Sequence, residues 1–194
     1  QIAQAGARLR EEAGVDIRVR AITNRRRMWL ADGSAPFPAD WRARLDSGEA
    51  PDLATLVAHL AADGAPHLAV VDATASDALP DRYPAWLARG IHVVTANKRA
   101  GSEDLGRYRR IRAAARGRGS AWHYETTVGA GLPVLGALRD LVETGDEILE
   151  IEGLLSGTLS WLFTTWDGAR PFSEVVREAK RRGFTEPDVR DDLG

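Results

Sequence analysis

Residues 67–98, with the sequence HLAVVDATASDALPDRYPAWLARGIHVVTANK, contain two strand-like segments on either side of a helix-like one. The segments 67–72 and 91–95 are short, apolar and rich in valine, which is typical of buried strands. Residues 80–89 have the apolar spacing of a helix. A strand, a helix and a second strand at these distances predict a parallel pair joined by a right-handed crossover.

The same alternation continues on both sides of this stretch. Toward the N-terminus we expect a helix over 1–13, a buried strand over 15–22 and helices over 39–46 and 52–63. Toward the C-terminus we expect a helix over 103–117 and a strand over 121–124. This order predicts an α/β fold, a Rossmann-type doubly wound parallel sheet. Because the chain starts inside a helix, the sheet is expected to lack its first strand.

The pattern changes beyond residue 127. A helix is expected over 133–142, a strand over 147–154 and two further helices over 158–166 and 173–182. We therefore predict two domains, with a boundary between residues 126 and 127.

Composition narrows the class of partner. The 194 residues include 26 Lys and Arg and 28 Asp and Glu. The chain as a whole therefore has no excess of positive charge that would attract nucleic acid or an anionic membrane. No apolar run approaches the roughly 20 residues of a membrane span. The absence of Cys excludes disulfides and thiolate chemistry, and the four His show no metal-ligand spacing. A small-molecule substrate and a cytoplasmic location are expected.

Polar residues follow the predicted strands, where an open parallel sheet binds its ligand. The expected cofactor-binding residues are Asn24, Arg25, Arg26, Thr74, Ala75, Thr95, Asn97 and Lys98. Arginines at the end of the first strand fit the 2′-phosphate of NADP, whereas an acidic residue there is typical of NAD. The sequence thus favours NADP over NAD, although a basic surface cluster explains Arg25 and Arg26 equally well.

Four segments together resemble the signature motifs of homoserine dehydrogenase, in the same order and at similar spacing. They are HVVTANK at 92–98, YETTVGAGLP at 124–133, LSGTLS at 155–160 and GFTEPDVRDDL at 183–193. The resemblance spans essentially the whole chain. It implies that residues 1–126 are an N-terminally truncated NAD(P)-binding domain and that residues 127–194 are the beginning of an α+β catalytic domain, truncated at its C-terminal end. Residues 23–60 are most similar to the dehydrogenase half of the bifunctional aspartokinase/homoserine dehydrogenases.

The resemblance implies reversible reduction of L-aspartate 4-semialdehyde to L-homoserine by NAD(P)H, a step of threonine, methionine and isoleucine biosynthesis. It implies Lys98, Glu186 and Asp192 as catalytic residues, and Gly157, Thr158, Glu186 and Asp192 as substrate-binding residues. These types suit the reaction, because a cation stabilises a developing alkoxide and carboxylates bind the substrate's ammonium group. Without the resemblance, Lys98 and Glu186 are as readily solvated loop residues.

The resemblance also implies a monovalent cation, usually sodium, held largely through backbone oxygens of Glu125, Val128, Ala130 and Leu132. It implies a homo-oligomeric parent protein, with an aspartokinase domain as a possible fusion partner. The family pattern departs at Phe184, where Tyr is common. It also continues past Gly194 to the Lys that usually donates the proton, and a glycine-rich loop belongs before Gln1. The 194 residues alone are therefore expected to be inactive.

Two other readings stay open at this point. One is a different Rossmann-type dehydrogenase that acts on another amino-acid semialdehyde. An acylating semialdehyde dehydrogenase is disfavoured, because it needs a Cys nucleophile. The other is a non-catalytic dinucleotide-binding sensor that kept the fold and lost the chemistry. The combination of Lys98, Glu186 and Asp192 favours the enzyme.

Overall fold

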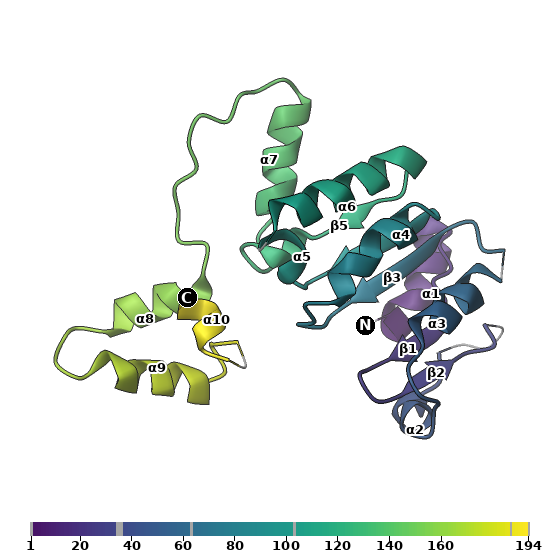
Figure 1. Cartoon of the computed structure of the whole chain (residues 1–194), viewed down its shortest axis with the longest axis horizontal. Helices are drawn as coiled ribbons and strands as arrows, with labels where there is room; N and C mark the ends of the chain where they lie inside the picture. The colour runs from purple at the N-terminus through teal and green to yellow at the C-terminus, as the bar shows by residue number, and fades with distance from the viewer. Residues whose placement is uncertain (1, 34–36, 63, 103, 187, 194) are drawn as a thin grey trace. The chain divides into compact units, whose positions relative to one another are not determined.

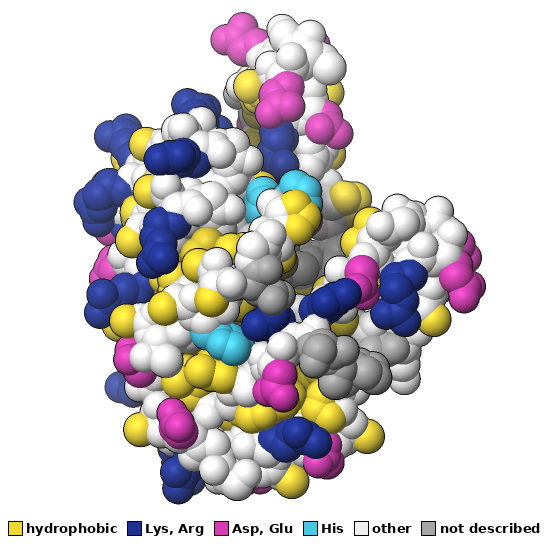
Figure 2. All heavy atoms as spheres, turned by 90° about the vertical axis from the view of Figure 1, so that its right-hand side faces the viewer, with side chains coloured by type: hydrophobic (Ala, Val, Ile, Leu, Met, Phe, Trp, Pro, Cys, Tyr) yellow, Lys and Arg dark blue, Asp and Glu magenta, His cyan; other side chains and the backbone are white. Residues whose placement is uncertain are grey.

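The computed structural model describes residues 2–33, 37–62, 64–102, 104–186 and 188–193. They belong to two compact units, Gln1–Ala69 and Val70–Gly194. None of the helices in these ranges is long and apolar enough to cross a membrane. On the face shown in Figure 2, side chains of both charges lie interspersed with apolar ones, in keeping with the net charge of -2.

The first unit combines three helices with a β-hairpin. Helix α1 (Ile2–Ala13) ends at Gly14, which adopts a φ of 63° readily because glycine has no Cβ. Strands β1 (Ala21–Thr23) and β2 (Met28–Leu30) pair antiparallel. Helices α2 (Trp41–Asp46) and α3 (Leu53–Ala61) follow, and the Asp52 carboxylate caps α3 by accepting from the Ala54 N–H. The buried residues of the unit are Met28, Leu45, Leu56, Val57 and Leu60.

The prediction of a buried strand over 15–22 is wrong in its larger part. Only Ala21–Thr23 is a strand, and Val15 and Ile17 each expose 45% of their surface. Among the described residues the partner of β1 is β2, and this ladder runs from Ala21 to Thr23 only. Residues 15–20 thus have strand-forming side chains but no ladder to join, and extended segments need such a partner.

The second unit contains the predicted parallel sheet (Figure 1). Its strand order is β3 (Leu68–Asp72), β4 (Ile91–Thr95) and β5 (Trp122–His123), with Val93 opposite Trp122 and Val94 opposite His123. The crossover from β3 to β4 is a 3-10 turn η1 (Leu79–Arg82) and helix α4 (Tyr83–Leu87). Helices α5 (Arg99–Ser102) and α6 (Leu105–Arg118) connect β4 to β5. The fold is therefore the expected α/β class.

The core of this sheet lies between α4, β4 and α6. Tyr83, Leu87, Ile91, Val93 and Ile111 are each less than 2% exposed. Helix α6 is defined at both ends, because the Asp104 carboxylate accepts from the N–H groups of Gly106 and Arg107, and Gly119 takes a left-handed φ of 66°. These contacts fix β4, and with it the residues that follow β4.

The C-terminal part of the second unit is helical. The 3-10 turn η2 (Glu125–Thr127) leads to α7 (Val134–Glu143), and α8 (Gly157–Thr165), α9 (Phe172–Arg181) and the short α10 (Arg190–Leu193) come later. Helices α8 and α9 pack through Leu162, Val175 and Ala179, which are fully buried.

The strand predicted over 147–154 is not formed. The segment has the alternation of a strand, but no described residue pairs with it, and Leu149 and Leu154 expose 87% and 77% of their surfaces. A strand is stabilised by its neighbour rather than by its own pattern, so the alternation alone does not produce one.

Candidate functional site

A buried polar network joins the carboxyl ends of β3 and β4. Asp72, Thr95 and Asn97 are 2%, 3% and 1% exposed, and Tyr83 is fully buried beside them. The Asp72 carboxylate accepts from the Tyr83 hydroxyl, from Asn97 Nδ2 at 3.1 Å and from the Thr74 N–H at 2.8 Å. Burial, together with the Asp72 carboxylate, raises the pKa of Tyr83 well above its usual range, so Tyr83 is a neutral donor.

Thr95 and Asn97, both expected to bind the cofactor, use their side chains inside this network. Thr95 Oγ1 donates to the Asp72 carbonyl at 3.1 Å and accepts from the Asn97 N–H at 2.9 Å. Asn97 Nδ2 also donates to the Ser76 carbonyl at 2.9 Å. A cofactor contact at these two positions is therefore left to backbone atoms. Thr74 and Ala75 are exposed in the loop after β3.

Lys98 meets the C-terminal motif in a cluster of three chain segments. Its Nζ lies 2.6 Å from Glu186 Oε1, in an ion pair whose side chains are 56% and 37% exposed. The Glu186 N–H donates to Asp192 Oδ2 at 2.7 Å. Thr158 Oγ1 lies 2.6 Å from the Phe184 carbonyl and 3.2 Å from Asp192 Oδ1. The structure thus brings together Lys98, Glu186, Asp192 and Thr158.

The remaining substrate-side residue, Gly157, is the first residue of α8. Ser156 caps this helix by accepting from the Leu159 N–H at 3.2 Å. Gly157 is exposed next to Thr158. Pro187, which belongs to the same motif as Glu186, lies outside the described residues.

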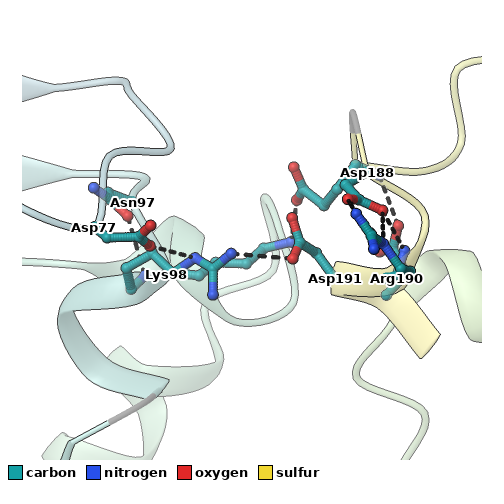
Figure 3. A network of polar contacts seen from close by, with 9 residues as sticks. Asp77, Asn97, Lys98, Asp188, Arg190 and Asp191 are labelled. Atoms are coloured by element: carbon teal, nitrogen blue, oxygen red, sulfur yellow. Dashed lines mark hydrogen bonds and ion pairs between the residues drawn. The ribbon is translucent and has the colours of Figure 1, made fainter. Parts of the chain in front are cut away.

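A second ion pair joins the same two regions of this unit. Arg99 contacts Asp191 at 3.1 Å and Asp77 at 3.1 Å, so it connects the loop after β3 with α10 (Figure 3). Asp188 pairs with Arg190 in the same view, and the guanidinium lowers the pKa of Asp188 far below its usual range. Two cationic side chains that follow β4 are therefore held by acids of the C-terminal motif.

In the first unit, Asn24, Arg25 and Arg26 form the turn of the β1–β2 hairpin. Asn24 Oδ1 accepts from the N–H groups of Arg26 and Arg27 at 2.7 and 2.9 Å, so Asn24 shapes the turn rather than extending from it. The side chains of Arg25 and Arg26 are exposed. Such a turn presents two guanidinium groups to solvent.

The segment expected to hold a cation forms a tight turn before α7. Glu125 Oε1 accepts from the N–H groups of Leu135 and Gly136 at 2.9 and 3.1 Å, at the start of α7. Ala130 has a left-handed φ of 53°. Among the hydrogen bonds of the described residues, none reaches the carbonyl oxygens of Val128 or Ala130, whereas the Leu132 carbonyl accepts from the Val134 N–H. The described residues contain no cluster of three or more His or acidic side chains suited to a metal ion.

Two features of the site were missed from sequence. Tyr83 belongs to a helical segment whose other buried members are apolar, so its pattern marks it as core. A polar atom in a helix that faces two polar strand ends was the only available signal. Arg99 was not singled out, because its partner Asp191 is 92 residues away.

Comparison with known proteins identifies the family of the chain. The family model "Homoserine dehydrogenase, NAD binding domain" matches residues 2–125, and "Homoserine dehydrogenase" matches 133–194. Bifunctional aspartokinase/homoserine dehydrogenase 1 of Zea mays is 45% identical over 195 residues, covering 100% of this chain and 21% of the relative. Bifunctional aspartokinase/homoserine dehydrogenase 2 of Escherichia coli strain K12 is 52% identical over 126 residues, covering 65% of this chain and 16% of the relative. The chain thus spans about a fifth of such relatives.

Comparison with solved structures points to the same family. A Candida auris protein described as being of unknown function has a TM-score of 0.78 and 33% identity, over 99% of this chain and 55% of that one. A hyperthermophilic archaeal homoserine dehydrogenase mutant in complex with NADPH has a TM-score of 0.71 and 25% identity, over 96% of this chain and 58% of that one. With a family model over most of its length and the cluster at Lys98 in place, the chain belongs to the homoserine dehydrogenase family.

Proposed function

We propose that this chain supplies the cofactor-binding and substrate-binding residues of an enzyme that reversibly reduces L-aspartate 4-semialdehyde to L-homoserine with NAD(P)H. The observation that carries the proposal is the contact of Lys98 with Glu186 at 2.6 Å. The residues lie 88 positions apart in the chain, in two motifs of the family. A cation and a carboxylate side by side support a site for a substrate that has an aldehyde oxygen and an ammonium group.

The chemistry of the cluster suits an aldehyde that carries an ammonium group at its other end. When bound, the nicotinamide supplies the hydride. The Lys98 ammonium stabilises the negative charge that develops on the carbonyl oxygen. Glu186 binds the α-ammonium group through a charge-assisted hydrogen bond. Because Lys98 occupies Oε1, the ammonium group is expected at Oε2, for which no hydrogen bond is seen among the described residues. One carboxylate can then orient both ends of a short substrate.

Asp192 and Thr158 support this arrangement. Both oxygens of Asp192 already accept hydrogen bonds, from the Glu186 N–H and from Thr158 Oγ1. We therefore propose that Asp192 acts first by fixing the loop that carries Glu186, and that its charge adds to the attraction of the ammonium group. Gly157 and Thr158 complete the substrate side at the start of α8.

For the cofactor, we propose NADP rather than NAD. The exposed guanidinium groups of Arg25 and Arg26 can pair with a 2′-phosphate, which NAD lacks. Thr74, Ala75 and the backbone of 95–98 are the proposed contacts in the second unit. Their position after β3 and β4 is where parallel sheets bind such ligands.

A monovalent cation, sodium by resemblance, is proposed at the turn before α7. The residues present fit this ion in part. The Val128 and Ala130 carbonyls have no hydrogen bond among the described residues, and Glu125 keeps one oxygen beyond the one on α7. Carbonyl and carboxylate oxygens suit a hard cation.

The larger assembly is also a proposal. A boundary between 126 and 127 is supported by the gap between the two family matches, which end at 125 and start at 133. Fusion to an aspartokinase is supported by the names of the maize and bacterial relatives. A homo-oligomer and a cytoplasmic location stay predictions, and the maize relative is described as chloroplastic.

The decisive experiment is NADPH oxidation with L-aspartate 4-semialdehyde by the full-length protein that contains this chain. We expect turnover in the wild type and its collapse, by at least 100-fold in kcat/KM, in Glu186→Gln, because about 3 kcal/mol is typical for loss of a buried or charge-assisted partner. Asp188→Asn is the matched control, since Asp188 carries the same charge in the same loop but pairs with Arg190. No turnover by a folded protein that still binds NADPH would favour another dehydrogenase or a sensor.

A further inference from the structure

Lys98 is an exposed side chain on a backbone segment that is held by buried bonds. Its neighbours are fixed on both sides, because Asn97 is 1% exposed and Asn97 Oδ1 accepts from the Arg99 N–H at 3.1 Å. Asn97 is in turn bound through Nδ2 to Asp72 and Ser76. The position of Lys98 therefore depends on the buried side chains of Asn97 and Asp72.

Tyr83 is the one member of this network that comes from a helix. It is fully buried in α4, and its ring lies 5.8 Å from that of Trp86. Its hydroxyl donates to Asp72 Oδ2 and lies 3.2 Å from Thr95 Oγ1. Thr95 Oγ1 also accepts the Asn97 N–H, one residue before Lys98. The tyrosine oxygen thus touches both strand ends at once.

Loss of the Tyr83 hydroxyl would leave the buried Asp72 carboxylate short of a hydrogen-bond donor. Within the described residues its hydrogen-bond donors are Tyr83, Asn97 and the Thr74 backbone, all of them uncharged. A buried carboxylate that loses a donor must find another. Asn97 Nδ2 shares Asp72 Oδ2 with the Tyr83 hydroxyl and also donates to the Ser76 carbonyl, so loss of the hydroxyl would disturb the amide that holds the segment before Lys98.

We propose that Tyr83 is a positioning residue for Lys98: through Asp72 and Thr95 its hydroxyl fixes the 95–98 backbone, so that Lys98 Nζ meets Glu186 and the carbonyl oxygen of the substrate. This inference rests on the proposed role of Lys98 in carbonyl reduction. Tyr83 itself touches neither substrate nor cofactor, because it is fully buried.

The test is Tyr83→Phe in the full-length protein, which removes one oxygen and keeps the ring packed against Trp86. We expect kcat for the aldehyde to fall by about tenfold, in line with the steep dependence of rate on geometry. Tyr108→Phe is the matched control, since its hydroxyl lies 3.2 Å from that of Tyr124 and outside the network; its kcat should change less than twofold. An unchanged kcat in Tyr83→Phe would overturn the proposal.

A double-variant comparison separates positioning from loss of folding. In a Lys98→Met background, Tyr83→Phe should cost nothing further, because the group that it positions is gone. The same fold-loss in both backgrounds would show a general structural effect and overturn the proposal. If Tyr83→Phe does not fold, Thr95→Val replaces it with the same expected loss, and an unchanged rate in that variant would overturn the proposal.

A readout without turnover keeps this inference distinct from the proposed function. The chain contains two lysines, Lys98 and Lys180, so acetylation of Lys98 can be measured against Lys180 by mass spectrometry. Tyr83→Phe should raise the acetylation rate of Lys98 severalfold relative to Lys180, as the ion pair with Glu186 loosens. An unchanged ratio would overturn the positioning role, whereas a wild type that does not reduce the aldehyde would overturn the proposed function alone.

Discussion

The side chains of the candidate site fall into two groups: buried ones that fix its geometry and exposed ones that can contact a substrate. Asp72, Thr95 and Asn97 are buried and hydrogen-bonded, whereas Lys98 and Glu186 keep 56% and 37% of their side chains exposed. The exposed ion pair itself adds little to stability, because solvent screens it. The pair matters for geometry instead. Each side chain holds the other in a solvent-exposed position that a small polar substrate can also reach.

At the same scale, Arg25 and Arg26 are expected to set the cofactor preference. Replacing both by Ala in the full-length protein should raise the KM for NADPH by roughly 10-fold or more, because each charge-assisted contact contributes about 1.5–3 kcal/mol. The KM for NADH should change little, since NADH has no 2′-phosphate. Steady-state kinetics with both cofactors measure this.

Arg18→Ala is a matched control in the same unit, because Arg18 is paired with Asp16 instead of being presented by the hairpin turn. It should leave both KM values within twofold. An NADPH KM that does not rise in the double variant would reduce the Arg25/Arg26 pair to a basic surface cluster.

Helices and strands that show a local pattern in the sequence could be predicted from it, whereas strands that depend on a partner strand could not. Strand β4 was predicted with its observed limits, because five residues of alternating burial follow directly from Ile91, Val93 and Thr95. The β1–β2 hairpin was missed, because its turn has no Gly, and the Asn24 side chain supplies the hydrogen bonds instead. The strand over 147–154 failed for the opposite reason: the pattern is present and the neighbour is not.

Residues of the site could likewise be predicted where they depend on a local pattern, but not where they depend on a distant partner. That Lys98 follows a strand end could be read from its surroundings, but its contact with Glu186 spans 88 positions and was accessible only through resemblance to a family. The role of Tyr83 was accessible through neither. Its hydroxyl matters because of where α4 is packed, and packing is a property of the folded unit.

Helix α6 offers a test of how its C-terminal end is formed. Gly119→Ala should lower the unfolding midpoint of the unit, because an alanine at a φ of 66° costs about 1 kcal/mol. Gly117→Ala should raise it, since Gly117 lies inside the helix and no atom lies within 4 Å of the place that an added methyl group would take. Alanine is favoured over glycine there by up to about 1 kcal/mol.

Urea unfolding followed by the fluorescence of this unit, in the full-length protein, measures the pair. Two substitutions of the same kind, two residues apart, should thus have opposite signs. A shift of the same sign in both would mean that Gly119 does not end the helix through its left-handed backbone.

The turn before α7 can be tested by removing its proposed ion. If a cation organises the Glu125–Leu132 carbonyls, replacing sodium and potassium by a bulky organic cation should lower both the activity and the melting temperature of the full-length protein. Glu125→Gln should reduce this sensitivity, because a neutral amide binds a cation more weakly than a carboxylate. Equal activity and melting temperature in both buffers would remove the ion from the proposal and leave Glu125 as the cap of α7.

At the scale of the whole molecule, the chain presents apolar surface that its described residues do not cover. Leu149, Ile151 and Leu154 expose 87%, 58% and 77% of their surfaces in one segment, and Phe163 on α8 exposes 61%. Several large apolar side chains exposed in one short segment are typical of an interaction site or an aggregation hazard. The chain spans about a fifth of its maize relative, and we propose that segments corresponding to the rest of such a relative cover this surface.

We therefore expect the 194-residue chain on its own to bind an apolar dye such as ANS strongly and to associate at micromolar concentration, whereas the full-length protein does neither. Replacing Leu149 and Leu154 by Lys in the isolated chain should reduce dye binding by at least half, because it removes the two most exposed apolar side chains of the segment. The same pair of substitutions in the full-length protein should instead lower its stability, by about 2 kcal/mol or more, because two charges would then be buried against apolar partners.

Dye fluorescence and light scattering for the isolated chain, with thermal unfolding for the full-length protein, distinguish the two settings. A full-length protein that tolerates both lysines without loss of stability would show that this segment faces solvent in the complete molecule as well.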